Sequence, residues 1–504
     1  MAINLLLRTI LSAALVATLL AGGARPAAAQ ARPGPPSRGA LSRGTLAITG
    51  VTVVPMTSER TLSGVTVLVR DGRIAAIGRN VAVPAGAARI DGRGKYLIPG
   101  LADMHTHLYS DGATPDSAGP AELGVLVANG ITAARLMIGT PEHLLLRRAV
   151  TEGAIVGPQL WVASPHFTTE AAENARVVTT ADGVRAAVRE VKAAGYDFVK
   201  VTVGIVGPLY DALVDEARRA GIRVVGHVEP EVGVARAIAD GQQIEHLDGY
   251  FEAALADSAP MQVSLTQGGV YRAERWKSLD YIDDAKLTAL ARATARAGIW
   301  TVPTLEIFNR AFSDPLADDA LCALPDWNMI PPHMRAPYVR SRTRYWAAPV
   351  SREQRLRYAA IRNSLVRRIA EAGGAGRIMA GSDSPDLLMA YGFTMHRELA
   401  HMVRAGLTPY QALAAATRNP AEFLGASAEW GTIAVGRRAD LVLLAADPLS
   451  DIRNTERIEG VAVGGRWIAK PELERMIDAG RRAVNGQAPP PPSDGGSCLG
   501  AGAR

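Results

Sequence analysis

Two histidines lie one residue apart at the end of an apolar run, in the segment GLADMHTHLYSDG over residues 100–112. Side chains at positions i and i+2 of a β-strand point to the same side, because strand side chains alternate between faces. His105 and His107 could therefore bind one metal ion together. Two surface histidines in a loop would show the same pattern, so the pair alone is weak evidence.

Between residues 99 and 429, short apolar runs alternate with amphipathic segments such as ADGVRAAVREVKAAG and GPLYDALVDEARRAG. This alternation is typical of parallel strands joined by helices. Eight of the apolar runs are candidate strands, and most of them end in polar residues: GLADMHTH, GITAARLM, PQLWVASPH, YDFVKVTV, IRVVGHVE, QQIEHLD, GIWTVPTLE and RIMAGSDS. We predict an α/β fold with a (β/α)8 barrel over residues 99–429, whose active face lies at the carboxyl ends of the strands.

Six residues that could ligate a metal end five of these predicted strands: His105, His107, Lys200, His227, His246 and Asp383. A histidine in a strand is often only a core residue, and an aspartate at a strand end often caps the next helix. Lys200 is flanked by valines, where an unpaired ammonium would be costly to bury. Their joint position favours one shared metal site over six separate structural roles.

The two ends of the globular region carry similar β-prone runs. Near the start, VRDGRIAAIG has Asp71-Gly72 between apolar runs, which predicts a hairpin, and GTIAVGRRADLVLLAADPL follows the barrel region. We predict one small β-sandwich domain built from residues 45–98 and 430–472; two unrelated β segments are the alternative. Residues 473–504 are predicted as a helix remnant and a disordered tail rich in proline and glycine.

The first residues have the pattern of an export signal. Arg8 precedes the apolar run TILSAALVATLLAGG, and small residues follow at Ala27 and Ala29. We predict a signal peptide over residues 1–29 and a disordered linker over 30–44, with an uncleaved membrane anchor as the alternative. No later run is apolar enough to span a bilayer, so we expect an exported protein, periplasmic or secreted, that is free of the membrane after cleavage.

Composition narrows the classes of partner. The 504 residues carry a formal net charge of +6, but the arginines are scattered rather than grouped with aromatic residues, which argues against nucleic acid binding. Cys322 and Cys498 could form one disulfide and are too few for a disulfide scaffold. We expect a small-molecule substrate, and a homo-oligomer is left open.

The order H-x-H, Lys, His, His, Asp on the first, fourth, fifth, sixth and eighth predicted strands resembles the amidohydrolase superfamily. It is similar to the branch in which a carboxylated lysine bridges two divalent metals. GKYLIPGLADMHTHL, GHVEPEVGVARAIADGQQIEHLDGY and GTIAVGRRADLVLL resemble imidazolonepropionase-related and Xaa-Pro dipeptidase-like members. Imidazolonepropionase itself lacks the bridging lysine, so the likeness does not carry over its activity.

The resemblance implies a role for each residue. His105, His107 and Asp383 would hold one metal, His227 and His246 the second, and carboxylated Lys200 would bridge them. A hydroxide bridging the metals would attack the substrate, with Asp383 as general base and then general acid. Zinc is our first choice for both ions, with manganese, cobalt and iron as alternatives.

We therefore expect an exported, metal-dependent hydrolase of amide bonds, acting on peptide-like or N-acyl amino acid substrates. Hydrolysis of cyclic amides, lactones or phosphoesters by the same centre is the first alternative, and a catalytically silent periplasmic binding barrel is the second. His166 and Tyr250 are predicted to contact substrate. Glu229 stands where the dipeptidase relatives carry a tyrosine that helps hold the substrate carboxylate, and its charge speaks against such a substrate.

Overall fold

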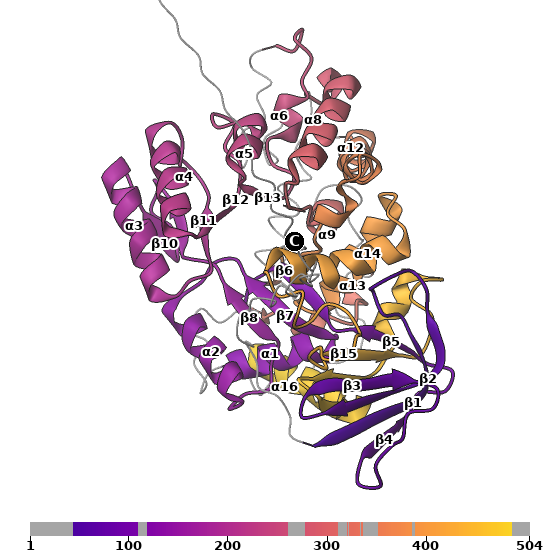
Figure 1. Ribbon diagram of the computed structural model, residues 1–504. Coiled ribbons are helices and arrows are strands. Elements are labelled where there is room, and N and C mark those ends of the chain that lie inside the picture. Colours follow the sequence, from indigo (N-terminus) through magenta and orange to yellow (C-terminus); the bar gives the residue numbers. More distant parts are fainter. Residues whose placement is uncertain are drawn as a thin grey trace, which may run out of the picture. The chain divides into compact units, whose positions relative to one another are not determined.

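The computed structural model describes residues 44–108, 118–260, 278–310, 320, 322–332, 334–335, 351–385 and 389–485 (Figure 1). All of these belong to one compact unit. The predicted signal peptide and most of the predicted linker lie outside the described residues, as do Cys498 and the proline-rich tail. Cys322 is disulfide-bonded.

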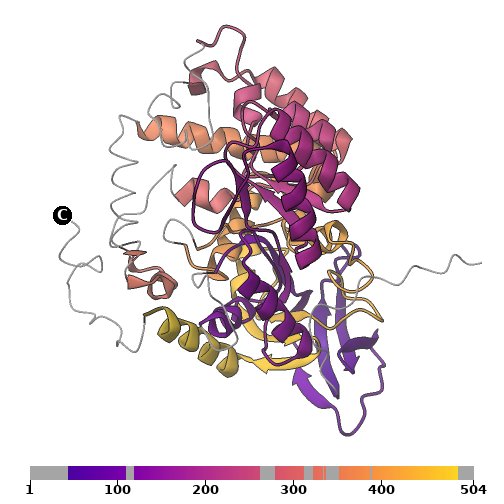
Figure 2. The ribbon, with the colours of Figure 1, turned by 90° about the vertical axis from the view of Figure 1, so that its left-hand side faces the viewer.

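Strands from both ends of the chain form one mixed sheet of eight strands in the order β17-β16-β15-β5-β1-β2-β3, with β4 paired to β1. Strand β15 joins the two ends by pairing antiparallel with β5, so the indigo and yellow strands share this sheet in Figure 2. The structure thus shows a single sheet where the sequence predicts a sandwich. The bounds are β1 Thr45–Val53, β2 Leu62–Arg70, β3 Arg73–Gly78, β4 Ala88–Asp91, β5 Tyr96–Pro99, β15 Leu441–Leu444, β16 Ile458–Val463 and β17 Arg466–Ala469.

The predicted hairpin at Asp71-Gly72 is confirmed. Arg70 of β2 pairs with Arg73 of β3 across the turn. Both turn residues have positive φ, 47° at Asp71 and 77° at Gly72, as a two-residue type I′ turn requires. A dipeptide that tolerates the left-handed region therefore sets the register of these strands.

The remaining strands form two parallel sheets, which establishes an α/β fold. One has the order β6-β7-β8 and the other the order β10-β9-β11-β12-β13-β14. Every residue of β6, β7, β8, β11, β13 and β14 is buried, as expected for parallel strands with both faces covered, whereas the edge strand β10 has no buried residue. The bounds are β6 Leu101–Thr106, β7 Ile131–Leu136, β8 Gln159–Val162, β9 His166–Thr168, β10 Ala175–Val177, β11 Phe198–Val201, β12 Arg223–Gly226, β13 Gln243–Glu245 and β14 Thr301–Val302.

Further parallel pairings connect these two sheets. Ala163, just after β8, bridges to Phe198 of β11, and Thr301 of β14 bridges to Ile378. Residues 377–384, predicted as the eighth strand, contain no assigned strand, yet their backbone also reaches β6. The amide of Met104 donates to the Ala380 carbonyl at 2.9 Å, and the amide of Asp383 donates to the His105 carbonyl at 2.6 Å. The ends of β6, β14 and residues 377–384 are therefore held together.

Helices separate the strands as the sequence predicts. Helix α3 buries Val184, Ala187, Val188 and Val191, which are three to four residues apart and form one apolar face. Glycines in the left-handed conformation follow α2, α3, α4, α5 and α8 and end each helix. The α-helices are α1 Gly119–Ala128, α2 Pro141–Glu152, α3 Ala181–Ala194, α4 Pro208–Ala220, α5 Val234–Asp240, α6 Tyr250–Ala253, α8 Asp284–Ala297, α9 Leu305–Phe308, α12 Arg352–Glu371, α13 Phe393–Arg404, α14 Pro409–Ala415, α15 Arg418–Phe423 and α16 Lys470–Asn485.

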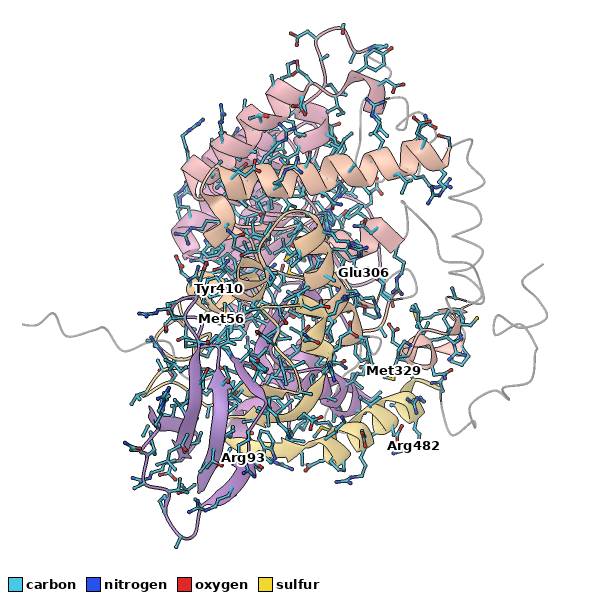
Figure 3. The ribbon with its side chains drawn as sticks, turned by 90° about the vertical axis from the view of Figure 1, so that its right-hand side faces the viewer. Met56, Arg93, Glu306, Met329, Tyr410 and Arg482 are labelled. Carbon is cyan, nitrogen blue, oxygen red and sulfur yellow. The ribbon has the colours of Figure 1, made fainter. Side chains whose placement is uncertain are left out.

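The eight-stranded sheet also contacts the α/β region through side chains. The Tyr410 hydroxyl of α14 donates to the carbonyl of Met56, just beyond β1, at 3.4 Å, and Figure 3 shows the two residues together. Among the described residues, no helix combines the length and the apolar character needed to cross a bilayer.

Candidate metal centre

The six predicted ligands come from the ends of the parallel strands. His105 is the next-to-last residue of β6, and Lys200 is the third residue of β11. His107, His227 and His246 lie one residue beyond β6, β12 and β13, and Asp383 lies in residues 377–384. Because parallel strands end at the same edge, this placement brings residues separated by up to 278 positions into one region.

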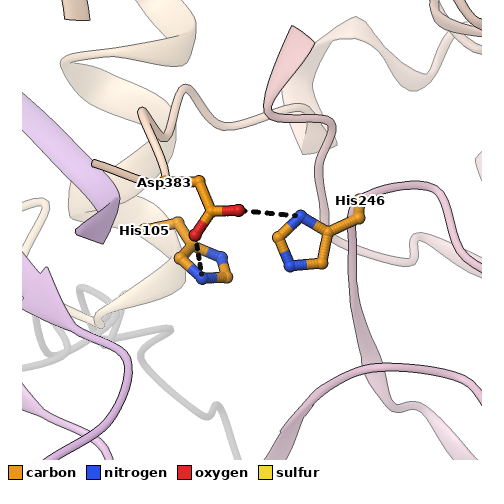
Figure 4. A group of neighbouring side chains, drawn as sticks. All are labelled: His105, His246 and Asp383. Atoms are coloured by element: carbon orange, nitrogen blue, oxygen red, sulfur yellow. Dashed lines mark ion pairs between the residues drawn. The ribbon is translucent and has the colours of Figure 1, made fainter. Parts of the chain in front are cut away.

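Asp383 is the centre of the ligand group. Its Oδ1 lies 3.1 Å from His105 Nε2 and 3.3 Å from His107 Nε2, and its Oδ2 lies 3.6 Å from His246 Nδ1. Figure 4 shows this carboxylate between His105 and His246. One ligand atom from each of these three residues falls within 4.8 Å of the others, a spacing that one metal ion can bridge.

His227 and Lys200 complete the group of predicted ligands around His246. The rings of His227 and His246 are stacked with centroids 4.7 Å apart. Lys200 is 2% exposed, and its charge lowers the pKa of His107, His227 and His246, so it lies close to all three imidazoles. Burial in turn lowers the pKa of Lys200 itself, although Glu245 and Asp383 oppose the shift.

A hydrogen bond holds Nδ1 of three of the four imidazoles. His105 Nδ1 lies 2.7 Å from Glu245 Oε2, and His227 Nδ1 lies 2.7 Å from Asp248 Oδ2. His246 Nδ1 lies 2.8 Å from Thr304 Oγ1. A partner at Nδ1 leaves Nε2 as the ligating nitrogen and fixes the direction of the ring.

These supporting residues were not found by sequence reasoning. Glu245 and Asp248 flank His246 in the segment QIEHLD, so their carboxylates were visible beside a predicted ligand. Glu245, however, contacts the histidine of another strand, and Thr304 reaches His246 from the loop after β14. Contacts between strands of unknown order leave no signal in a single sequence.

A buried ion pair between Glu245 and Arg135 contacts His105 through its Nδ1 atom. Glu245 accepts a hydrogen bond from Arg135 at 2.6 Å, and both side chains are fully buried. Arg135 also donates to the Met104 carbonyl at 2.6 Å and to Gln243 Oε1 at 2.8 Å. Burial raises the pKa of Glu245, but Arg135 and His105 outweigh it and bring the pKa to about 2. Glu245 therefore stays ionised and supports His105 electrostatically.

The loop that carries Asp383 is tied to β6 by Asp103. This buried carboxylate accepts hydrogen bonds from Ser382 Oγ at 2.6 Å, from the Ser382 amide at 3.0 Å and from the His105 amide at 3.2 Å. Burial raises its pKa to about 6, against these hydrogen bonds. The contacts fix Asp383, which has a φ of 54°, relative to the histidine pair.

The electrostatics of the ligands favour metal uptake. Burial raises the pKa of Asp383, but His105 and His246 outweigh it, so the pKa lies well below its usual value and the carboxylate is ionised. Burial lowers the pKa of His107, His227 and His246, which keeps these imidazoles neutral. For His105, Asp383 and Glu245 outweigh burial and raise the pKa. Neutral imidazoles beside an ionised carboxylate are a donor set that suits zinc and similar ions.

The two predicted substrate residues have different positions. His166 begins β9, is half-buried, and lies 3.2 Å through Nδ1 from Thr202 Oγ1, beside Lys200 and His227. Tyr250 is fully buried, and its hydroxyl lies 2.6 Å from Thr294 Oγ1 of α8. A phenol enclosed in this way packs α6 against α8, and a contact between Tyr250 and substrate stays a prediction.

Comparison with known proteins agrees with this geometry. The model of the amidohydrolase family matches residues 96–468, which is most of the chain. The chain belongs to the amidohydrolase family. The match begins in β5 and ends in β17, so the family region includes part of the eight-stranded sheet as well as all six predicted ligands.

Curated family members match over shorter stretches. Imidazolonepropionase of Methylobacterium sp. strain 4-46 is 31% identical over 257 residues, covering 44% of this chain and 61% of that protein. Dihydroorotase of Trichlorobacter lovleyi is 35% identical over 96 residues, covering 18% of this chain and 23% of that protein. The chain thus matches less than two thirds of the length of either relative.

Solved amidohydrolase-family folds match over nearly the whole chain. Bottromycin amidohydrolase superposes with a TM-score of 0.66 at 26% identity, covering 87% of this chain and 90% of that one. A Xaa-Pro dipeptidase with bound methionine superposes with a TM-score of 0.59 at 20% identity, covering 84% of this chain and all of that one. The second likeness shows the fold alone.

Proposed function

We propose that this chain is a metal-dependent amidohydrolase that cleaves amide bonds in peptide-like or N-acyl amino acid substrates. The convergence of His105, His107, His246 and the Asp383 carboxylate at one strand edge carries the proposal. Membership of the amidohydrolase family and the likeness to bottromycin amidohydrolase support it.

We further infer that the parallel strands form the (β/α)8 barrel. Pairings lead from β6 through β7 and β8 to Phe198 of β11, and then through β12 and β13 to β14. From Thr301 they continue to Ile378, and the backbone of residues 380–384 returns to β6. This cyclic order supports a closed barrel, with the ligands at its carboxyl end.

The residues fit two divalent ions. His105, His107 and Asp383 would hold one, and His227 and His246 the other. When bound, such ions acidify a water molecule and polarise the scissile carbonyl. Asp383 is ionised and faces both histidine groups, so it accepts the proton of the attacking water and returns it to the leaving amine.

Lys200 would bridge the two ions as a carbamate. As a cation it cannot ligate a metal, and among the described residues its amine has no hydrogen-bond partner. Its lowered pKa favours the neutral amine, the form that adds carbon dioxide. The carbamate is an anion with two oxygens, which removes the cost of a buried ammonium beside three imidazoles.

The substrate class is tested by hydrolysis. We expect the zinc-loaded chain to release amino acids from dipeptides or N-acyl amino acids, with lactones and phosphotriesters as comparison substrates. The matched control is Asp383→Asn, which keeps the size of the side chain. Cleavage of lactones or phosphotriesters alone would favour the first alternative, and metal uptake without cleavage of any of the four would favour a binding protein.

We also propose that the chain is exported. The apolar run after Arg8 and the small residues at Ala27 and Ala29 support a cleaved signal peptide. Expression of the full chain in a bacterium, followed by cell fractionation and N-terminal sequencing, should find Gln30 at the start of a periplasmic or secreted product. A cytoplasmic product that begins at Met1 would contradict export without affecting the hydrolase proposal.

A further inference from the structure

The backbone at His246 is strained. Strand β13 ends at Glu245, and the next two residues, His246 and Leu247, have φ values of 58° and 54°. The left-handed region is sterically unfavourable for residues with a Cβ. Such a conformation persists only where surrounding contacts hold it. A metal ligand placed on this turn therefore depends on those contacts for its direction.

Arg362 of α12 supplies one of these contacts. Its Nη2 donates a hydrogen bond to the His246 carbonyl, and its Nη1 donates to the Tyr358 hydroxyl at 3.0 Å. The side chain is 3% exposed, and the guanidinium carbon lies 3.4 Å from the centre of the Phe308 ring. The aromatic enclosure keeps water from competing for the carbonyl.

Stability alone does not explain this arginine. Within the described part of the chain, Arg362 forms no ion pair, whereas buried Arg135 pairs with Glu245 at 2.6 Å. Burial of a cation without a carboxylate partner destabilises a fold, and cation–π contacts offset only part of that cost. The contact with the His246 carbonyl is therefore the feature that a neutral side chain would not reproduce.

The ring of His246 is held from a second direction. Thr304 Oγ1 lies 2.8 Å from Nδ1, and Thr304 itself has a φ of 45°. Glu398 of α13 accepts a hydrogen bond from the Glu306 amide at 2.7 Å and thereby anchors the loop that carries Thr304. The backbone carbonyl and the Nδ1 atom of His246 are thus both held by hydrogen bonds. They direct its ring toward His105 and His227, whose ring centroids each lie 4.7 Å from that of His246.

We propose that Arg362 is a positioning residue for the metal ligand His246. Its hydrogen bond holds the left-handed turn in which the imidazole faces the other ligands. The inference rests on the proposed metal-dependent function, because it assigns to Arg362 an effect on metal binding rather than on the chemical step.

The test compares metal binding by variants of α12. Arg362→Met keeps an unbranched side chain without donors, and Arg362→Lys keeps one donor and the charge. Arg368→Met on the same helix is the control, since Arg368 bonds Asp284 and Thr288 of α8. Metal content, zinc affinity by chelator competition, the visible absorption of the cobalt form and the melting temperature would be measured for each.

We expect Arg362→Met to weaken binding of the His246-held ion by about 10- to 100-fold and to change the cobalt spectrum. Arg362→Lys should recover most of the affinity, and Arg368→Met should bind both ions as the wild type does. If Arg362→Met does not fold, Arg362→Leu, which also lacks donors, replaces it with the same expectation. Wild-type affinities and spectrum in a folded Arg362→Met or Arg362→Leu would overturn the inference. A wild-type chain that binds no metal would instead overturn the proposed function.

Discussion

The two halves of the candidate centre are built differently. In the Asp383 half, which consists of His105, His107 and Asp383, an ionised carboxylate already lies 3.1 and 3.3 Å from two imidazoles. In the Lys200 half, which consists of Lys200 and His227, a buried amine without a hydrogen-bond partner among the described residues lies near imidazoles. His246 lies between the halves and contacts Asp383 and His227.

The Asp383 half and the Lys200 half therefore depend on different chemistry. Asp103, Glu245 and Arg135 fix the Asp383 half from behind through short hydrogen bonds, so its geometry exists before a metal binds. In the Lys200 half, the proposed carbamate of Lys200 would supply the anionic ligand. We therefore expect the Asp383 half to tolerate loss of Lys200, whereas the Lys200 half does not.

The largest effect should come from Asp383→Asn. The amide cannot accept the proton of the attacking water, so kcat should fall by about 10³-fold. Steady-state kinetics of the zinc-loaded variant measure this loss, and Asp215→Asn on the exposed surface of α4 is the control. A variant that retains more than about a tenth of wild-type kcat would show that Asp383 is not the proton acceptor.

The second-largest effect should come from Lys200→Ala, which separates metal binding by the two halves. Lys200→Ala removes the bridging group but leaves every contact of Asp383, so the metal content should fall from about two ions per chain to about one. Elemental analysis after dialysis measures the ratio. Two tightly bound ions and full activity in this variant would contradict the bridging role.

Glu245→Gln tests the support behind His105. It removes the charge that pairs with Arg135 and leaves a buried cation, so the free energy of unfolding should fall by about 3–5 kcal/mol. Metal affinity of the Asp383 half should drop by about 10- to 100-fold. Denaturant unfolding and chelator competition report the two losses separately. An unchanged metal affinity would mean that the Asp383 half does not depend on the ion pair between Glu245 and Arg135.

The effect most remote from catalysis concerns Glu398, which anchors the loop behind His246, and it changes stability rather than activity. Burial raises its pKa from 4.5 to about 8. Between these pH values the unfolded state binds fewer protons than the folded state, so this group lowers stability as the pH rises. The stability of the metal-free Glu398→Gln variant relative to wild type should therefore increase from pH 5 to 8, by at most about 1.4 kcal/mol per pH unit. A difference independent of pH would contradict a buried neutral carboxyl.

Much of this architecture could be predicted from the sequence, and the reasons are physical. Apolar runs that end in His105, Lys200, His227 and His246 identify strands because burial on both faces demands continuous apolar residues. The supporting contacts could not be predicted, since Arg135 and Thr304 act across strands or loops that are distant in sequence. The burial of Tyr250 could not be predicted either, because its place four residues after His246 says nothing about the direction of a side chain on a short helix.

The most direct test of the proposed centre is the metal content of the wild-type chain. The chain would be stripped with a chelator, reconstituted with zinc and bicarbonate, freed of excess metal and measured by elemental analysis. Six converging ligands predict about two ions per chain, with hydrolysis restored in parallel. About one ion per chain or fewer would contradict a binuclear centre.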